Sequence, residues 1–141
     1  MKIIVSLLWF FSLSFIIYNA MQTGSDSSGF SLEITALFQK VLHIIHIEVE
    51  DSILHSVIRM SGHIIQYMIF GYTSLWVITI YQLKWYNMFR TLYVMILDET
   101  IQFFTPARAA EVLDIVFDMF GICIAWMIFK ISKRLFVKHG G

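Results

Sequence analysis

Apolar residues fill four stretches of the chain, and each is close to the length that crosses a membrane. A spanning helix needs about 20 predominantly apolar residues. We place the predicted spans at residues 3–20, 56–83, 86–104 and 106–129. Thr105 and Pro106 should open the last span, because threonine is a good N-cap and proline fits the first helical position. The pattern predicts an all-α membrane protein with a single domain, residues 1–141, built as a four-transmembrane-helix bundle.

The first stretch has two interpretations. It is uncharged and follows Lys2, as the apolar region of a secretory signal peptide does. It is longer than such a region usually is, and the bulky Tyr18 stands where a cleavage site needs a small residue. These two features favour a retained membrane helix.

The segment between the first two spans divides into two parts. Residues 21–31 are rich in serine and glycine, which predicts a flexible loop. Residues 31–55 repeat apolar side chains at helical spacing, which predicts an amphipathic helix. This helix should lie on the outer, extracytoplasmic surface of the membrane and lead into the second span. Its apolar stripe is Ile34, Phe38, Val41, Leu42, Ile45, Val49 and Ile53.

Composition supports the membrane assignment and excludes several other classes. Hydrophobic residues make up 58% of the chain and charged residues 14%, whereas soluble domains have about 25% charged residues. So apolar a chain is not intrinsically disordered. Ten basic against ten acidic residues argue against a nucleic-acid partner, and the single cysteine, Cys123, excludes a disulfide scaffold.

The charges are distributed unevenly once the four spans are drawn with a cytoplasmic N-terminus. The cytoplasmic side receives Lys2, Lys84, Arg90, Lys130, Lys133, Arg134 and Lys138, and the outer side receives Lys40, Arg59 and Arg108. Seven cations against three follow the positive-inside rule. Every acidic residue falls outside or in the outer half of a span. This predicts a multi-pass protein with both termini in the cytoplasm and its functional site facing outwards.

Polar side chains gather at one depth in three of the predicted spans. With a rise of about 1.5 Å per residue, they lie roughly 8–14 Å below the outer ends of their helices. Within each helix they recur at three- or four-residue spacing and so form one stripe. The three stripes are Arg59, His63 and Tyr67; Asp98 and Gln102; and Glu111, Asp114, Asp118 and Gly121, and Glu99 lies at the same depth as Asp98. Ionisable groups inside a span usually mark function, which favours a binding or reaction site over a network that only holds helices together.

The charge of this site constrains its chemistry. Arg59 and Arg108 supply two positive charges, and the acids of the third and fourth spans, Glu111 included, supply five negative ones. Either some carboxyl groups are protonated or a divalent cation binds, with Asp98, Glu99, Asp114 and Asp118 as candidate ligands. The two arginines, with Tyr67 nearby, are candidates for holding a phosphate or carboxylate at the headgroup level. The alternatives are snorkelling of Arg59 to the interface and an ion pair of Arg108 with Glu111 or Glu99.

Two motifs resemble those of the VanZ-like membrane protein family. The segment from Arg59 to Tyr67 resembles its R-K-x-x-H-x-x-E-Y signature, with Met60 and Gln66 in place of the lysine and the glutamate. The segment from Asp98 to Arg108 is similar to the D-E-x-x-Q-x-F-x-P-x-R motif. Asp114, Asp118 and Gly121 match the D-x-x-x-D-x-x-G that follows. The resemblance implies a bacterial cytoplasmic-membrane protein and a contribution to resistance against teicoplanin, a lipidated glycopeptide antibiotic.

Three functional hypotheses follow. In the first, the site binds, and in a catalytic form modifies, the headgroup of an anionic lipid or a lipid-linked cell-envelope precursor. The catalytic form is hydrolysis or transfer at a phosphoester or glycosyl centre. It would use His63, Asp98, Glu99, Gln102, Asp114 and Asp118 around a headgroup held by Arg59, Tyr67 and Arg108. In the second, a non-catalytic protein alters the envelope surface or binds a drug or partner. The third, proton-coupled transport, lacks an acidic residue in the inner half of the membrane.

Overall fold

The part of the chain described by the computed structural model, residues 2–108 and 112–139, is built from α-helices. This confirms the all-α prediction. Five α-helices and one short 3₁₀-helix follow one another there: α1 (Lys2–Met21), α2 (Gly24–Ile44), α3 (Asp51–Ile80), η1 (Trp85–Met88), α4 (Phe89–Phe104) and α5 (Val112–His139).

Three of these helices are long and apolar enough to cross a membrane. They are α1, α3 and the Leu113–Leu135 part of α5. Their outward side chains are largely apolar, with Phe11, Ile65 and Phe120 among many that are exposed. Helix α4 has 16 residues, fewer than the roughly 20 that span a bilayer. The membrane-protein class is therefore supported, whereas the fourth span and the orientation of the termini stay predictions.

The end of α4 corrects the prediction for Thr105 and Pro106. Proline disfavours a helical conformation in the residue before it, and Thr105 has extended angles, φ −85° and ψ 130°. Thr105 is therefore the C-cap of α4, and Pro106 lies in a turn where Ala107 takes a left-handed φ of 58°. The prediction placed Arg108 in the first turn of the last helix. In the structure it lies in this loop instead.

The segment between the first two spans also differs from its prediction. Helix α2 begins at Gly24, inside the stretch predicted to be a flexible loop. Thr23 caps it: its hydroxyl accepts the N–H of Asp26 at 3.3 Å and donates to the Asp26 carboxylate at 2.6 Å. A threonine with an acid three residues later is a helix-start signal. This local interaction overrides the serine- and glycine-rich composition.

The predicted helix over residues 31–55 is interrupted. Helix α2 ends at Ile44, and His46 has a φ of 58°, a left-handed conformation that breaks the helical path. Helix α3 begins at Asp51, earlier than the predicted start of the second span. Gln39 closes the turn by donating to the Val49 carbonyl at 2.6 Å and to the Asp51 carboxylate at 2.7 Å. The two helices therefore form a hairpin.

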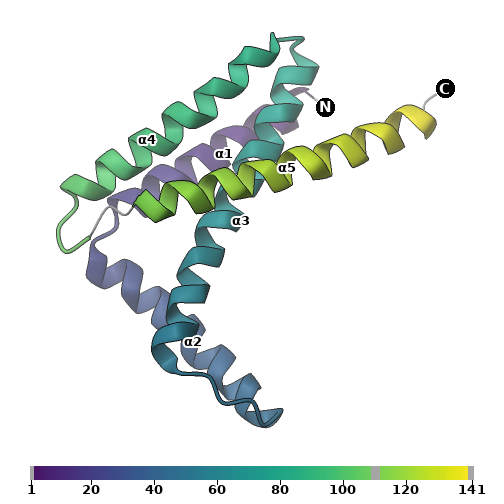
Figure 1. The fold of residues 1–141 in the computed structure, drawn as a ribbon. Coiled ribbons are helices and arrows are strands. Elements are labelled where there is room, and N and C mark those ends of the chain that lie inside the picture. The colour runs from purple at the N-terminus through teal and green to yellow at the C-terminus, as the bar shows by residue number, and fades with distance from the viewer. Residues whose placement is uncertain (1, 109–111, 140–141) are drawn as a thin grey trace.

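Figure 1 shows how the helices are arranged. Helices α1 and α4 lie side by side, and α5 crosses α3 beside them. The first half of α3 and all of α2 project from this group as the hairpin. Thirty residues make α3 about 45 Å long, well beyond a hydrocarbon core of about 30 Å. A helix of this length crosses such a core only if it is tilted or if one of its ends extends past the apolar layer.

A small core joins α1, α3 and α4. Ile16, Tyr67, Phe70 and Met95 are at most 1% exposed and pack together. Hydroxyl and indole groups add contacts between α1 and α3, including the bond from Trp9 Nε1 to Ser74 Oγ at 2.9 Å. Such interhelical hydrogen bonds are typical of membrane helices, where polar groups find partners inside the protein.

The crossing of α3 and α5 depends on small residues. Gly121 of α5 is buried, and a Cβ atom added there would collide with the backbone carbonyl of Ile64. One turn further on, Ala125 is fully buried against Gly71 of α3. Small residues at such positions let two helix backbones approach closely. Gly121, predicted as part of a polar stripe, thus serves the packing of the helices that carry the stripe.

We predict that Gly121→Ala destabilises the protein by about 1–3 kcal/mol, because the added methyl group must push two backbones apart. Gly62→Ala is the matched control: it makes the same change in α3, where an added Cβ meets nothing within 4 Å. Thermal unfolding of the detergent-purified variants, followed by circular dichroism, measures both. Equal melting temperatures for the two variants would contradict the proposed close contact.

Candidate functional site

The predicted site residues of α3 and α4 meet at Asp98. Its side chain is 2% exposed and accepts two hydrogen bonds, one from the Tyr67 hydroxyl and one from the Gln102 amide, both at 2.9 Å. Asp98 and Gln102 are four residues apart on α4 and so share a face. Tyr67 reaches them from α3 and is itself fully buried. Both oxygens of Asp98 are thereby fixed in direction.

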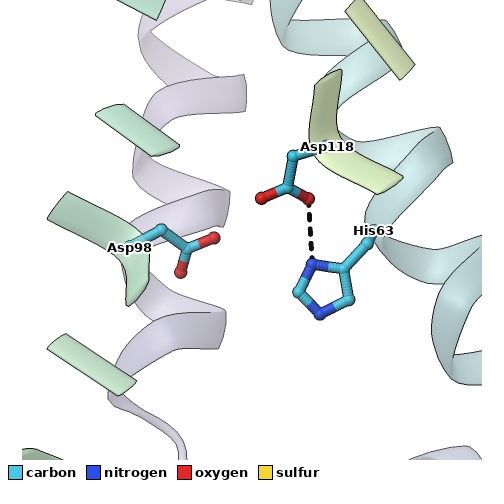
Figure 2. Close-up of side chains that lie close together, drawn as sticks. All are labelled: His63, Asp98 and Asp118. Atoms are coloured by element: carbon cyan, nitrogen blue, oxygen red, sulfur yellow. Dashed lines mark hydrogen bonds and ion pairs between the residues drawn. The ribbon is translucent and has the colours of Figure 1, made fainter. Parts of the chain in front are cut away.

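His63 lies between two carboxylates of α5. Its Nδ1 atom is 3.0 Å from Asp118 Oδ1, and its Nε2 atom is 3.7 Å from Asp114 Oδ2. Asp114 and Asp118 are four residues apart, so both face the imidazole ring. Figure 2 shows His63, Asp98 and Asp118 converging from α3, α4 and α5. We call these three residues the histidine–aspartate cluster.

The cluster has the donor atoms of a metal site. One ligand atom from each of its three residues lies within 4.8 Å of the other two. All three side chains are buried. Of the four acids predicted as candidate ligands, Asp98 and Asp118 belong to this group, and His63 completes it. Among the described residues, Glu99 and Asp114 stand outside the group.

Two arginines lie next to these acids. Arg59 Nη2 is 3.7 Å from Asp114 Oδ1, and its side chain is 42% exposed. Arg108 donates from Nε to the Gln102 carbonyl oxygen at 3.2 Å and from Nη1 to the backbone carbonyl of Asn19. These bonds tie the loop after α4 to the end of α1. The predicted alternative partner Glu111 lies outside the described residues.

Arg108 remains charged in this setting. Burial lowers the pKa of its guanidinium from the ordinary value, and the charges of Asp98 and Asp114 act in the opposite direction. An arginine side chain nevertheless keeps its proton at neutral pH in proteins. Arg108 therefore presents a fixed positive charge held by hydrogen bonds to Gln102 and Asn19.

A cavity of about 60 Å³ opens beside both arginines, several times the volume that one water molecule needs. We call it the two-arginine pocket. Its lining residues are Gly24, Ser27, Ser28, Ser31, Arg59, His63, Gln102, Ala107, Arg108 and Asp114. Two predicted anion-binding residues, Arg59 and Arg108, thus share one cavity. Tyr67, the third predicted anion-binding residue, does not line this cavity and instead donates its hydroxyl to the buried Asp98.

The sequence interpretation missed the wall that α2 contributes. Gly24, Ser27, Ser28 and Ser31 follow the spacing i, i+3, i+4, i+7, so they form one face of a helix. They fall in the stretch predicted to be a loop. The capping pair of Thr23 and Asp26 is the signal that would have identified the helix, and with it this face.

The start of α5 changes the depth of one predicted residue. Asp114 was expected about 8 Å below the end of the last helix. The described part of α5 runs from Val112, after the loop that holds Pro106 and Arg108, so Asp114 lies nearer the start of this helix than predicted. It therefore sits at the mouth of the site and lines the two-arginine pocket, while Asp118, one turn deeper, is 0% exposed.

Glu99 is placed differently from its neighbour Asp98. It is 8% exposed, and its Oε1 atom has no hydrogen-bond partner within the described part of the chain. The structure therefore brings eight of the nine predicted site residues into two bonded chains and leaves Glu99 buried beside them. One chain runs from Arg59 through Asp114 and His63 to Asp118, and the other runs from Tyr67 through Asp98 and Gln102 to Arg108.

We predict that Tyr67→Phe lowers the free energy of unfolding by about 1–3 kcal/mol, because it leaves one buried oxygen of Asp98 without its donor. Tyr72→Phe is the matched control on the same helix, since the Tyr72 hydroxyl donates to Ser132 in a half-buried position at 3.2 Å. Thermal unfolding in detergent should show a clearly larger loss for Tyr67→Phe. A smaller loss than for Tyr72→Phe would mean that the Asp98 network adds little stability.

Comparison with known proteins gives one family. The model of the family described as VanZ/LLP1 matches residues 2–133, which is nearly the whole chain. No curated protein and no solved structure matches the chain significantly. The match extends over all helices that carry the site, from α1 to α5. The chain therefore belongs to the VanZ/LLP1 family.

Proposed function

We propose that this protein binds the anionic headgroup of a membrane lipid or of a lipid-linked cell-envelope precursor in the two-arginine pocket. The observation that carries the proposal is that Arg59 and Arg108, from α3 and from the loop after α4, line one cavity. Guanidinium groups match phosphate and carboxylate oxygens in geometry and charge. Two of them facing one small space favour an anion as its occupant.

The pocket is partly preorganised. Arg108 is held by Gln102 and Asn19, so little side-chain entropy is lost when it contacts a ligand. Arg59 is more exposed and pairs with Asp114, which also lines the pocket. Ser27 and Ser28 of α2 also line the pocket and can add hydroxyl donors. The set resembles the mixture of charged and neutral donors that anion sites use.

The position of the pocket favours a lipid over a free anion. It lies where α1 ends at Met21 and α5 begins at Val112, which is one boundary of the apolar helices. Around it, α2 exposes Phe30, Leu37 and Phe38, as a helix that rests on a membrane surface does. A lipid could place its headgroup in the pocket while its chains follow the apolar helix surfaces.

We also propose the orientation and the process. Seven of the ten cations lie away from this end if the chain crosses the membrane four times, which puts the pocket on the outer face of a bacterial cytoplasmic membrane. Envelope precursors present their headgroups there. Membership of the VanZ/LLP1 family supports a contribution to resistance against teicoplanin-type glycopeptides, which act on such precursors.

A catalytic form of the same function is favoured by His63. It lines the pocket, and its ring is oriented by Asp118 at 3.0 Å, as the ring of a general base is. In this form Asp98, Glu99 and Asp114 would complete the acid and base groups, and Gln102 would orient the headgroup. The reaction would be hydrolysis or transfer at a phosphoester or glycosyl centre. In the non-catalytic form the same residues serve only to hold the helices.

We predict that detergent-purified protein binds phosphatidylglycerol in preference to phosphatidylcholine, as measured by native mass spectrometry of lipid adducts. Arg108→Gln and Arg59→Gln should each weaken phosphatidylglycerol binding about tenfold, because a hydrogen bond to a charged group contributes about 1.5–3 kcal/mol. Arg90→Gln is the control: it removes one exposed arginine from the other end of α4 and should change little.

Two results would count against the lipid proposal. Equal binding of the two lipids by the unmodified protein would remove the charge preference. An equal loss in Arg90→Gln would show that overall charge and not the pocket controls binding. A competition arm with inorganic phosphate separates the sources of the anion: full displacement of the lipid at a matched concentration would identify a site for a free anion.

A further inference from the structure

We propose that His63, Asp98 and Asp118 bind a divalent first-row transition metal ion, with Zn²⁺ as the best representative. This site lies beneath the two-arginine pocket and does not depend on an anion being bound there. Its residues come from three helices, α3, α4 and α5, and meet in the buried interior (Figure 2). The proposal therefore adds a cofactor to the headgroup function and can fail or succeed separately from it.

The geometry needs a modest change to accept an ion. Zinc binds histidine nitrogen and carboxylate oxygen at about 2.0–2.2 Å, so two ligands of a tetrahedral ion lie roughly 3.3–3.6 Å apart. The ligand atoms of the cluster all lie within 4.8 Å of one another, and His63 Nδ1 and Asp118 Oδ1 are 3.0 Å apart. Closing the set therefore requires the widest pair of ligand atoms to approach by up to about 1.5 Å.

One buried oxygen atom of the cluster lacks a hydrogen-bond partner. Asp118 is 0% exposed, yet its Oδ2 atom has no hydrogen-bond partner within the described residues. Figure 2 shows the carboxylate of Asp118 directed into the space that it shares with His63 and Asp98. An unpaired buried carboxylate oxygen costs folding free energy, at least about 1–3 kcal/mol. A cation bound to this oxygen would supply the missing interaction.

The surrounding groups have the character of an outer shell around a metal. Tyr67 and Gln102 fix the two oxygens of Asp98 through hydrogen bonds of 2.9 Å. Asp114 faces the second nitrogen of His63 at 3.7 Å, on the side away from Asp118. Metal-binding histidines usually donate their other ring nitrogen to a carboxylate, which fixes the ring and raises its basicity.

The balance of charges in the site also favours a bound divalent cation. Asp98, Glu99, Asp114 and Asp118 carry four negative charges when ionised, and Arg59 and Arg108 supply two positive ones. A divalent cation would cancel the difference of two among these described groups. Uncompensated charge of this size is costly in a poorly solvated interior.

The ligand types select the class of ion. Imidazole suits zinc, iron and nickel, whereas Mg²⁺ and Ca²⁺ prefer six or more oxygen ligands. One imidazole and two carboxylates match a first-row transition metal. Three protein ligands also leave a fourth position open, as catalytic zinc sites do. His63 lines the two-arginine pocket as well, so the open position would be reached from there.

The test is isothermal titration of Zn²⁺ into the full chain, purified in detergent without a polyhistidine tag and stripped with a chelator. We expect a site that binds one Zn²⁺ per chain and does not respond to Mg²⁺ under the same conditions. Zn²⁺ should also raise the melting temperature, because a ligand of the folded state stabilises it. This second measurement needs no variant and so is independent of whether variants fold.

Variants assign the ligands. Loss of an outer-shell partner typically weakens metal binding about 10–100-fold, so Asp118→Asn and Asp98→Asn should weaken it by about 100-fold or more. Glu99→Gln is the matched control, since it neutralises the neighbouring buried acid of α4 outside the ligand set. Arg108→Gln should also retain Zn²⁺, which separates the metal site from the headgroup pocket.

Three results would overturn the proposal. The first is the lack of both Zn²⁺ binding and thermal stabilisation in the unmodified chain. The second is Zn²⁺ binding that persists unchanged in Asp118→Asn, which would place the ion elsewhere, for example on the exposed His43 and His46. The third is loss of Zn²⁺ in Glu99→Gln with retention in Asp98→Asn, which would assign the wrong ligand set.

Discussion

The need to pair buried polar groups inside an apolar helix bundle shapes this protein. Water is scarce there, so most hydrogen-bonding groups find a partner within the chain, and among the described residues Glu99 Oε1 and Asp118 Oδ2 are buried exceptions. Asp98 meets this need through Tyr67 and Gln102, and Gln102 passes the chain of bonds to Arg108. Arg108 continues it to Asn19 at the end of α1. One buried carboxylate thus links α3, α4, the following loop and α1, and the packing of these elements depends on it.

The sequence predicted the site better than it predicted the helix ends. Residues four apart share a helix face, so His63 with Tyr67, Asp98 with Gln102, and Asp114 with Asp118 had to point the same way. The three faces meet in the structure, where His63 contacts Asp118 and Asp114 and Tyr67 contacts Asp98, as expected from the cost of burying ionisable groups without partners. Periodicity and charge, which are readable along the chain, determine this part of the structure.

Helix boundaries depended on interactions that composition hides. The capping pair of Thr23 and Asp26 turned a serine-rich loop into the first turn of α2. Pro106 ended a helix through its effect on Thr105, where an N-cap was predicted. Gly24 also packs directly on the turn at Ala107, a contact between residues far apart in sequence. No pattern within a single window of residues could have indicated that contact.

That contact has a consequence for how the protein is made. The turn after α1 and the turn after α4 are fastened together: the Gly24 N–H donates to the Pro106 carbonyl at 3.1 Å, and the Thr105 hydroxyl donates to the Ala20 carbonyl at 3.1 Å. The serine wall of the pocket is synthesised early, whereas Gln102, Arg108 and Asp114 emerge only with the second half of the chain. The pocket therefore cannot form until the second half of the chain has been synthesised and has packed against the first. A chain arrested before α5 has the serine wall but no Asp114 to complete the pocket.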